Sequence, residues 1–103
     1  VGKIALAVDG RSVQVAGKPV LLTRKEYDLL LLLAKNKGKV FTREQLHDLV
    51  WGLDYARSSL RTVDTHIKTL RLKLGEASQY IHTIWGVGYK LEEPVELGEQ
   101  GEN

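Results

Sequence analysis

Basic and hydroxyl-bearing side chains share one face of a helix that the sequence predicts over residues 59–74. Apolar residues recur there at i, i+4, i+7 and i+11, which predicts one narrow buried stripe made of Val63, Ile67, Leu70 and Leu74. The opposite face then carries Arg61, Thr65, Lys68, Thr69 and, unexpectedly, the apolar Leu72. Arginine and lysine neutralise phosphates, and threonine offers a base edge a methyl group and a small donor or acceptor. This combination is typical of a helix that binds nucleic acid.

A short two-stranded ribbon follows this helix directly. Its strands are expected over residues 81–85 and 88–91, with the turn at Gly86 and Val87. Gly86 and Gly88 predict a hairpin turn and not a phosphate-binding loop, because they do not precede a helix. A helix has the right width for the major groove of DNA, and a ribbon beside it can reach the neighbouring backbone or minor groove.

The formal net charge of +2 conceals an uneven distribution. Residues 92–103 hold five glutamates and no basic residue, which leaves 15 basic and 8 acidic residues over residues 1–91. Many basic domains bind nothing anionic, but this excess suits an anionic partner, most commonly nucleic acid. We expect one domain over residues 1–91 and an acidic, flexible tail over residues 92–103.

Several other classes of protein are disfavoured. Cysteine is absent, and His47, His66 and His82 lack metal-ligand spacing, so neither a metal nor another cofactor is expected. The sequence has no nucleophile with a paired base and no phosphate loop, which argues against an enzyme. The longest apolar run, residues 29–34, is far too short for a membrane span, and no signal peptide is recognised. We therefore expect a cytoplasmic protein that does not contact a membrane.

The elements that must support the helix over residues 59–74 are predicted from turn and capping residues. Residues 1–22 alternate in hydrophobicity and predict an antiparallel meander whose last strand lies near residues 19–22. Thr23 with Glu26 and Thr42 with Gln45 form capping boxes, which predict the starts of two helices. The first helix is expected to bury Tyr27, Leu30, Leu31 and Ala34 and to end by Gly38. The second is expected to bury Leu46, Leu49 and Val50 and to end at Trp51 and Gly52.

Three stretches of this sequence closely resemble a known family. LTRKEYDLLLLLAKNKGKVFTREQLHDLVWG, RTVDTHIKTLRLKL and IHTIWGVGYKL resemble the OmpR/PhoB-type DNA-binding domain of two-component response regulators, in the same order and spacing. The resemblance covers nearly everything from residue 4 to residue 91. It implies an α+β winged helix-turn-helix with an N-terminal antiparallel sheet, three helices and a C-terminal hairpin wing. It also implies control by a phosphorylated receiver domain of the same full-length protein, outside this chain.

The resemblance assigns roles residue by residue. It implies base contacts from Asp64, Thr65, His66, Thr69 and the wing residue Trp85. It implies phosphate contacts from Arg43, Trp51, Arg61, Lys68, Arg71, Thr83 and Tyr89. Two positions depart from the family, whose members often carry a basic residue at the position of Thr69 and arginine at that of Trp85. The tryptophan could stack on sugar, insert at a base step or pack on the domain. The ring of Trp51 could equally be core, and the arginines could be solvated charges.

Partners are likewise implied by the resemblance. The chain is expected to bind tandem half-sites of double-stranded DNA as a homodimer. The loop at residues 53–59, with Tyr55 and Arg57, is expected to contact RNA polymerase. The alternative function is a winged-helix protein-interaction module with little or no specific DNA binding. Leu72 on the outer face, the absent wing arginine and the acidic tail favour that alternative.

Overall fold

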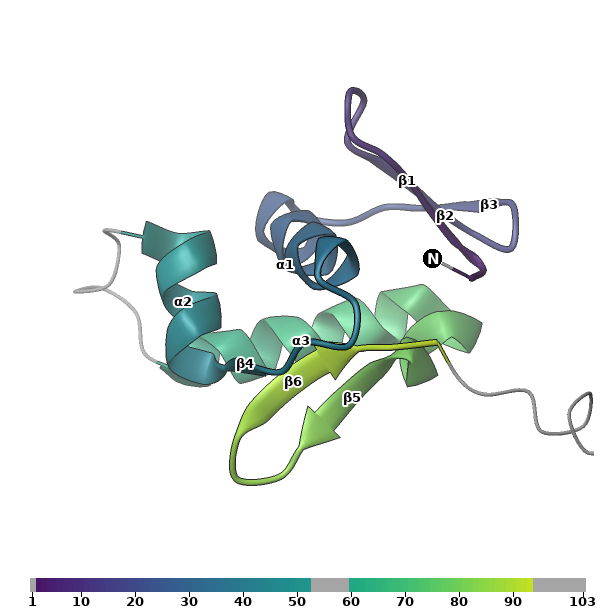
Figure 1. Cartoon of the computed structure of the whole chain (residues 1–103). Helices are drawn as coiled ribbons and strands as arrows, with labels where there is room; N and C mark the ends of the chain where they lie inside the picture. The colour runs from purple at the N-terminus through teal and green to yellow at the C-terminus, as the bar shows by residue number, and fades with distance from the viewer. Residues whose placement is uncertain (1, 53–59, 94–103) are drawn as a thin grey trace, which may run out of the picture.

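Helices α1, α2 and α3 separate two small antiparallel sheets in the computed structural model, which describes residues 2–52 and 60–93 (Figure 1). The N-terminal sheet lies above the helices in this view and the C-terminal sheet below them. In chain order the elements are β1 (Ile4–Ala7), β2 (Ser12–Val15), β3 (Lys18–Val20), α1 (Arg24–Lys35), β4 (Phe41–Thr42), α2 (Arg43–Trp51), α3 (Leu60–Leu74), the 3-10 helix η2 (Gly75–Tyr80), β5 (Ile81–Ile84) and β6 (Gly88–Leu91).

The N-terminal sheet is the meander that the alternating sequence predicts. Its strand order is β1-β2-β3, and all its pairings are antiparallel. Ile4, Val13 and Val15 point into the core, whereas the residues between them on β2 are exposed. The last strand is β3 and not residues 19–22: it ends at Val20, and the side chain of Leu21 is 91% exposed.

Helix α1 begins at the predicted capping box, but its buried face differs from the predicted one. The Thr23 hydroxyl accepts from the Glu26 N–H, and the Glu26 carboxylate accepts from the Thr23 N–H. The buried residues are Glu26, Tyr27, Leu29, Leu30 and Leu33, while Leu31 and Ala34 are only partly buried. Hydrophobicity alone cannot identify the buried face here, because residues 29–33 are all leucine and another residue that the core buries is the carboxylate Glu26.

Helix α2 also begins at its predicted capping box, in which Gln45 takes the place that Glu26 has in α1. It buries Leu46, His47 and Trp51, and the predicted core residue Leu49 is 61% exposed. The rings of His47 and Trp51 stack with centroids 5.6 Å apart. These two large rings fill the space that the sequence pattern assigns to smaller aliphatic side chains.

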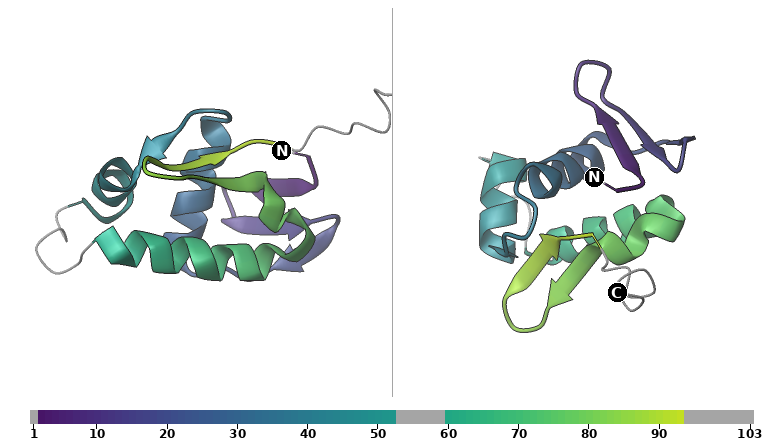
Figure 2. Two further views of the ribbon diagram at one scale, coloured as in Figure 1. Left: turned by 90° about the horizontal axis from the view of Figure 1, so that it is seen from below. Right: turned by 45° about the vertical axis from the view of Figure 1, so that its right-hand side comes forward.

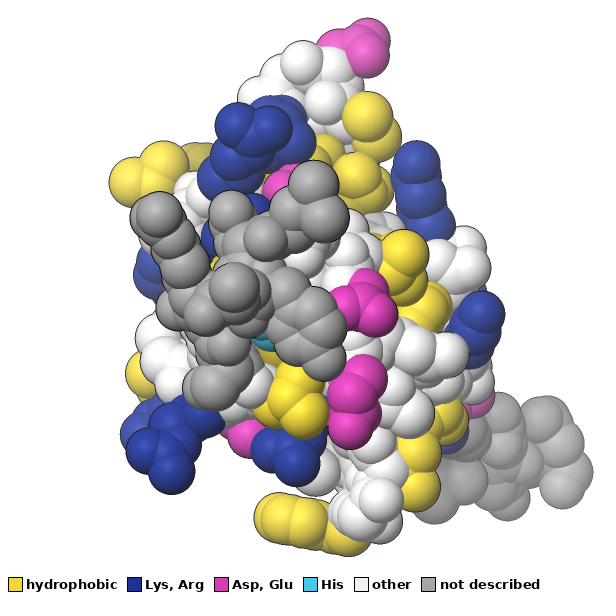
Figure 3. All heavy atoms as spheres, turned by 90° about the vertical axis from the view of Figure 1, so that its left-hand side faces the viewer, with side chains coloured by type: hydrophobic (Ala, Val, Ile, Leu, Met, Phe, Trp, Pro, Cys, Tyr) yellow, Lys and Arg dark blue, Asp and Glu magenta, His cyan; other side chains and the backbone are white. Residues whose placement is uncertain are grey.

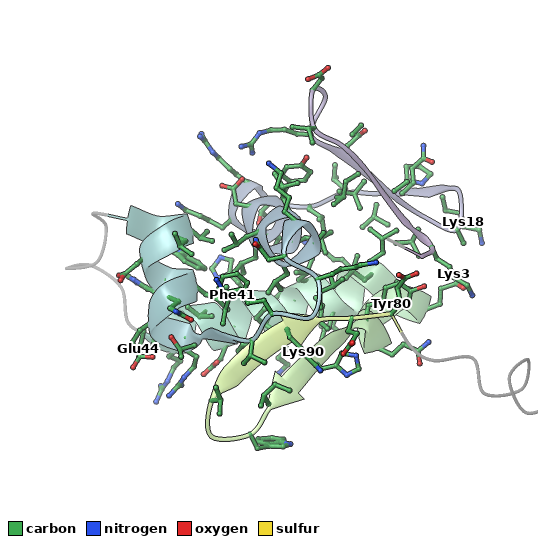
Figure 4. The ribbon with its side chains drawn as sticks, in the orientation of Figure 1. Lys3, Lys18, Phe41, Glu44, Tyr80 and Lys90 are labelled. Atoms are coloured by element: carbon green, nitrogen blue, oxygen red, sulfur yellow. The ribbon has the colours of Figure 1, made fainter. Side chains whose placement is uncertain are left out.

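Helix α3 buries the predicted stripe, since Val63, Ile67, Leu70 and Leu74 are at most 1% exposed. The α-helix ends at Leu74, with Gly75 at a φ of 57°. The unpredicted 3-10 helix η2 then carries the chain to the wing. Its Tyr80 hydroxyl accepts from the Lys3 N–H at 3.0 Å, which joins η2 to the start of the N-terminal sheet (Figure 4).

The C-terminal sheet has three strands in the order β4-β6-β5. Strand β4 was not predicted, because two residues are too few to show an alternating pattern. A Cβ at Gly88 would lie 1.9 Å from the Phe41 carbonyl oxygen, so only glycine permits this pairing of β6 with β4. Strand β5 ends at Ile84, which puts Trp85 in the turn. We call residues 81–91 the wing; its strands run alongside α3 (Figure 2).

Candidate nucleic-acid interface

The outer face of α3 carries Arg61, Thr65, Lys68 and Leu72, all of them exposed. We call these four residues the reading face. They lie opposite the buried stripe, as the helical periodicity predicts. The Thr65 hydroxyl donates to the Arg61 carbonyl oxygen at 3.1 Å, within the helix. Leu72 is 73% exposed, so most of its apolar surface faces solvent.

Thr69 was predicted on this outer face, but the structure places it half-buried at the edge that meets α1. Its hydroxyl donates to Glu26 Oε2 at 2.5 Å and lies 3.1 Å from the His66 carbonyl oxygen. The hydroxyl is therefore not a free donor for a base.

Glu26 is the acidic centre beneath this edge of α3, and its side chain is only 3% exposed. Its Oε1 atom accepts from the Thr23 N–H at 2.9 Å and from Lys73 Nζ at 2.7 Å. Burial alone would raise the pKa of Glu26, but the hydrogen bonds from Lys73, Thr69 and Thr23 outweigh it and lower the pKa from 4.5 to about 2. The capping box identified Glu26 only as a helix start. The spacing of Thr69 and Lys73, one helical turn apart, was the signal for its second role.

Asp64 was predicted at the edge of base readout, and the structure turns it towards the wing and α2 instead. One carboxylate oxygen accepts from the Tyr89 hydroxyl at 2.7 Å, and the other from Arg43 NH1 at 2.9 Å. Burial, then the hydrogen bond and charge of Asp64, raise the pKa of Tyr89 to about 12. Asp64 thus joins three elements, and both of its oxygens are already engaged.

Arg71 and Thr83 were predicted to reach phosphates, but in this structure they bind one another. Arg71 donates to the Ile81 carbonyl oxygen through Nε at 3.2 Å and NH2 at 2.7 Å, and to Thr83 Oγ1 at 2.8 Å. The Arg71 guanidinium also lies 5.8 Å from the centre of the Tyr89 ring. Arg71 lies on the flank of α3 that faces the wing. Its charged side chain therefore holds the wing against the helix.

Trp51 and Tyr89, also predicted at phosphates, are both buried to 9% exposure. The Trp51 ring meets the His66 ring edge-on, with centroids 5.0 Å apart. His66 was predicted near the base readout; its Nδ1 atom lies 2.8 Å from the Thr62 carbonyl oxygen. The core alternative for the Trp51 ring is therefore the one that the structure adopts. The rings of Trp51 and His66 thus form part of the contact between α2 and α3.

The wing turn presents Trp85 to solvent at 89% exposure, with Val87 beside it at 50%. The alternative that Trp85 packs on the domain is therefore wrong. A cleft separates the wing turn from the start of α2. Arg43, Glu44, Asp64 and Tyr89 line it together with residues 83–88. Figure 4 shows Glu44 pointing away from the body of the protein at this end.

On the face that Figure 3 shows, the visible Lys and Arg side chains stand in several groups, and Asp and Glu side chains lie on the same face. Tyr55 and Arg57, predicted to contact RNA polymerase, lie outside the described residues. Within residues 2–52 and 60–93, no helix has the length and hydrophobicity needed to cross a membrane.

A helix with an exposed basic face, two supporting helices and a hairpin wing define a winged helix-turn-helix domain. The sequence comparison is specific about its kind. The chain belongs to the family described as "Transcriptional regulatory protein, C terminal", whose model matches residues 17–91. This confirms the resemblance to the OmpR/PhoB-type DNA-binding domains of response regulators. The family consists of transcription regulators and not of enzymes.

Similar proteins agree with this assignment. The chain is 51% identical over 88 residues to the transcriptional regulatory protein SrrA of Staphylococcus aureus, covering 82% of this chain and 36% of SrrA. It is 40% identical to DrrB, an OmpR/PhoB homologue of Thermotoga maritima, with a TM-score of 0.79 over 89% of this chain and 42% of DrrB. The DNA-binding domain of Klebsiella pneumoniae RstA, solved with the RstA box, is 30% identical, with a TM-score of 0.77 over 88% of this chain and 92% of that one. The chain thus spans about a third of the length of SrrA.

Proposed function

We propose that this domain reads a specific DNA sequence by placing α3 in the major groove. The observation that carries the proposal is the reading face, where Arg61, Thr65 and Lys68 are exposed while the rest of the helix is held by the core, α1 and the wing. Arg61 and Lys68 contact phosphates, which fixes the position of the helix. Thr65 contacts a base edge. Thr69 contacts a neighbouring base edge through those atoms of its side chain that its internal hydrogen bond leaves free.

The wing turn and the start of α2 complete the proposed interface. Trp85 lies against the backbone or minor groove, where its ring can stack on sugar or insert at a base step. Its 89% exposure supports this, since an apolar ring of that size gains little from water. Arg43 holds a phosphate, exchanging its exposed ion pair with Asp64 for one with DNA. In this scheme Asp64, Arg71, Thr83 and Tyr89 keep the wing and α3 at a fixed spacing, and Trp51 and His66 hold α2 against α3.

The remaining part of the proposal concerns assembly. Two copies bind tandem half-sites head to tail, with centres about one helical turn of DNA apart. A phosphorylated receiver domain of the same protein controls this assembly, and the shared family and the greater length of SrrA support that arrangement. Tyr55 and Arg57 contact RNA polymerase. A Tyr55→Ala, Arg57→Ala double variant should then lose transcription activation while binding DNA normally; retained activation would contradict the contact.

The test of the DNA proposal is selection of bound duplexes from a random library by the purified domain at moderate salt. Enrichment of a direct repeat with a period of about one helical turn would support it. Arg61→Ala should weaken binding to all retained sequences alike, whereas Thr65→Ala should change the preference at one base pair. Retention without any motif would contradict sequence reading by α3. An absence of retention would favour the protein-interaction module, for which the exposed Leu72 is the best structural support.

A further inference from the structure

The hydroxyl proton of Thr69 is used inside the protein. A threonine hydroxyl has one proton, and two acceptors lie within its reach: Glu26 Oε2 at 2.5 Å and the His66 carbonyl oxygen at 3.1 Å. The shorter bond, to a carboxylate, takes the proton. Glu26 is ionised at neutral pH, because its hydrogen-bond donors lower its pKa to about 2. Thr69 therefore has no proton left to donate outwards.

What Thr69 can offer to DNA is then limited to its methyl group and the lone pairs of its oxygen. In the major groove guanine presents two acceptors, N7 and O6, which need a donor. Thymine presents a methyl group, and its partner adenine presents an amino donor. A methyl group beside an oxygen that only accepts matches the thymine–adenine pair and leaves the guanine acceptors unpaired.

We propose that Glu26, a residue of α1 that is buried away from DNA, is a specificity-determining positioning residue. By holding the proton of Thr69 it makes α3 read a thymine methyl group and reject guanine at one base pair. This inference rests on the proposed function, since it needs α3 in the major groove. A buried residue of another helix thereby sets the preference of Thr69, which lies half-buried at the edge of α3.

Glu26→Gln is the sharpest test, because it reverses the hydrogen bond without removing the capping box. Gln45 fills the same position in the capping box of α2, where its Oε1 accepts from the Thr42 N–H at 2.9 Å. In the variant, Oε1 can still accept from Thr23 N–H and from Lys73. The amide group that replaces Oε2 donates to the Thr69 oxygen, so the hydroxyl proton is no longer held by residue 26 and is shared between the His66 carbonyl oxygen and the groove.

The measurement is binding of the selected duplex with each thymine in turn replaced by deoxyuridine, which lacks only the methyl group, or with the pair replaced by guanine–cytosine. In the unmodified protein one deoxyuridine opposite Thr69 should weaken binding about fourfold, the value of one buried methyl group. Thr69→Ser should abolish that effect, and Thr69→Val should keep it. Glu26→Gln should lower the thymine-over-guanine ratio there about fivefold, the value of one hydrogen bond.

The matched control is the Thr69→Val background, which keeps the methyl group and has no hydroxyl to reorient. Glu26→Gln should leave the base ratio unchanged there. Two outcomes would overturn the inference: an equal shift of the base ratio in both backgrounds, or the lack of any deoxyuridine position whose effect disappears in Thr69→Ser. A selected motif would still support the proposed function in either case. No motif at all would overturn both. If Glu26→Gln failed to fold by circular dichroism, Thr69→Val would decide, because a hydroxyl with no proton to donate cannot bind guanine: its removal should not raise the thymine-over-guanine ratio, and a raised ratio would overturn the inference.

Discussion

The buried carboxylate of Glu26 makes the stability of this domain depend on acid pH in a way that one substitution can isolate. Its pKa is lowered from 4.5 to about 2 in the folded protein. Between these values the unfolded chain binds a proton at Glu26 that the folded protein does not. The contribution to stability is therefore fully present above pH 4.5 and is lost as the pH falls towards 2. At about 1.4 kcal/mol per pKa unit it amounts to roughly 3 kcal/mol.

Urea unfolding of the unmodified domain and of Glu26→Gln, followed by circular dichroism between pH 7 and pH 2, measures this contribution. Glutamine does not titrate, so the difference between the two free energies of unfolding removes the effect of all other carboxylates. We expect the unmodified domain to lose its advantage with a slope of about 1.4 kcal/mol per pH unit below pH 4.5. Should the domain unfold before pH 2, the slope between pH 4.5 and pH 3 gives the same answer.

Glu76→Gln is the matched control. Glu76 pairs with Lys3 at 3.0 Å, but its side chain is 53% exposed, so water screens the pair. Surface pairs of this kind contribute about 0–1 kcal/mol, so Glu76→Gln should change the free energy of unfolding by no more than that. If the unmodified domain and Glu26→Gln kept a constant difference in stability from pH 7 to pH 3, the carboxylate would not hold a lowered pKa. The network that joins α1 to α3 would then be misassigned.

Three further outcomes are expected. Asp64→Asn removes the charge that, together with burial, raises the pKa of Tyr89, so the pKa of Tyr89 should fall from about 12 towards 10.0. A titration of phenolate absorbance measures this pKa, and Tyr89→Phe identifies its transition by deleting it. Gly88→Ala should destabilise the domain by about 1–3 kcal/mol, because its Cβ would meet a backbone carbonyl oxygen of β4 at 1.9 Å; Gly10→Ala, with nothing within 4 Å, should not. Lys68→Ala should reduce the slope of log affinity against log salt by about 0.9, and an unchanged slope would remove Lys68 from the phosphate contacts.

The sequence was sufficient for the parts of the fold that depend on local physics. Both capping boxes are present with both of their hydrogen bonds, because the capping pattern involves only four consecutive residues. The buried stripe of α3 and the exposed Leu72 follow from helical periodicity alone. Strand β4 and the 3-10 helix η2 could not be found in this way. The first is held by a partner strand far along the chain, since Phe41 pairs with Tyr89, 48 residues away. The second lacks a distinctive pattern.

The candidate site, like the fold, was predictable only where it depends on local sequence patterns. Periodicity identified which residues of α3 point outwards, but it could not say which flanking side chains would find partners on other elements. The resemblance implies DNA contacts for Arg71 and Asp64, and in the structure each of them makes a contact with the wing. Thr69 was assigned by position, and the carboxylate that takes its proton comes from α1, 43 residues away. Such pairings depend on how helices pack, which no local pattern encodes.

The charged residues on the two flanks of α3 do related work, and this has a consequence for how the domain tolerates change. The ion pair of Glu26 and Lys73 holds one flank to α1. On the other flank, Arg71 donates to the Ile81 carbonyl oxygen and Asp64 accepts from the Tyr89 hydroxyl, which holds α3 to the wing. Removing Lys73 leaves the buried charge of Glu26 without its ion-pair partner, which costs more than the pair contributes. A substitution on the reading face between the flanks leaves no buried charge uncompensated, because the side chains of this face are exposed. If α3 reads DNA as proposed, base preference can therefore change through Thr65 at little cost in stability, whereas a change at Glu26 should alter stability and preference together.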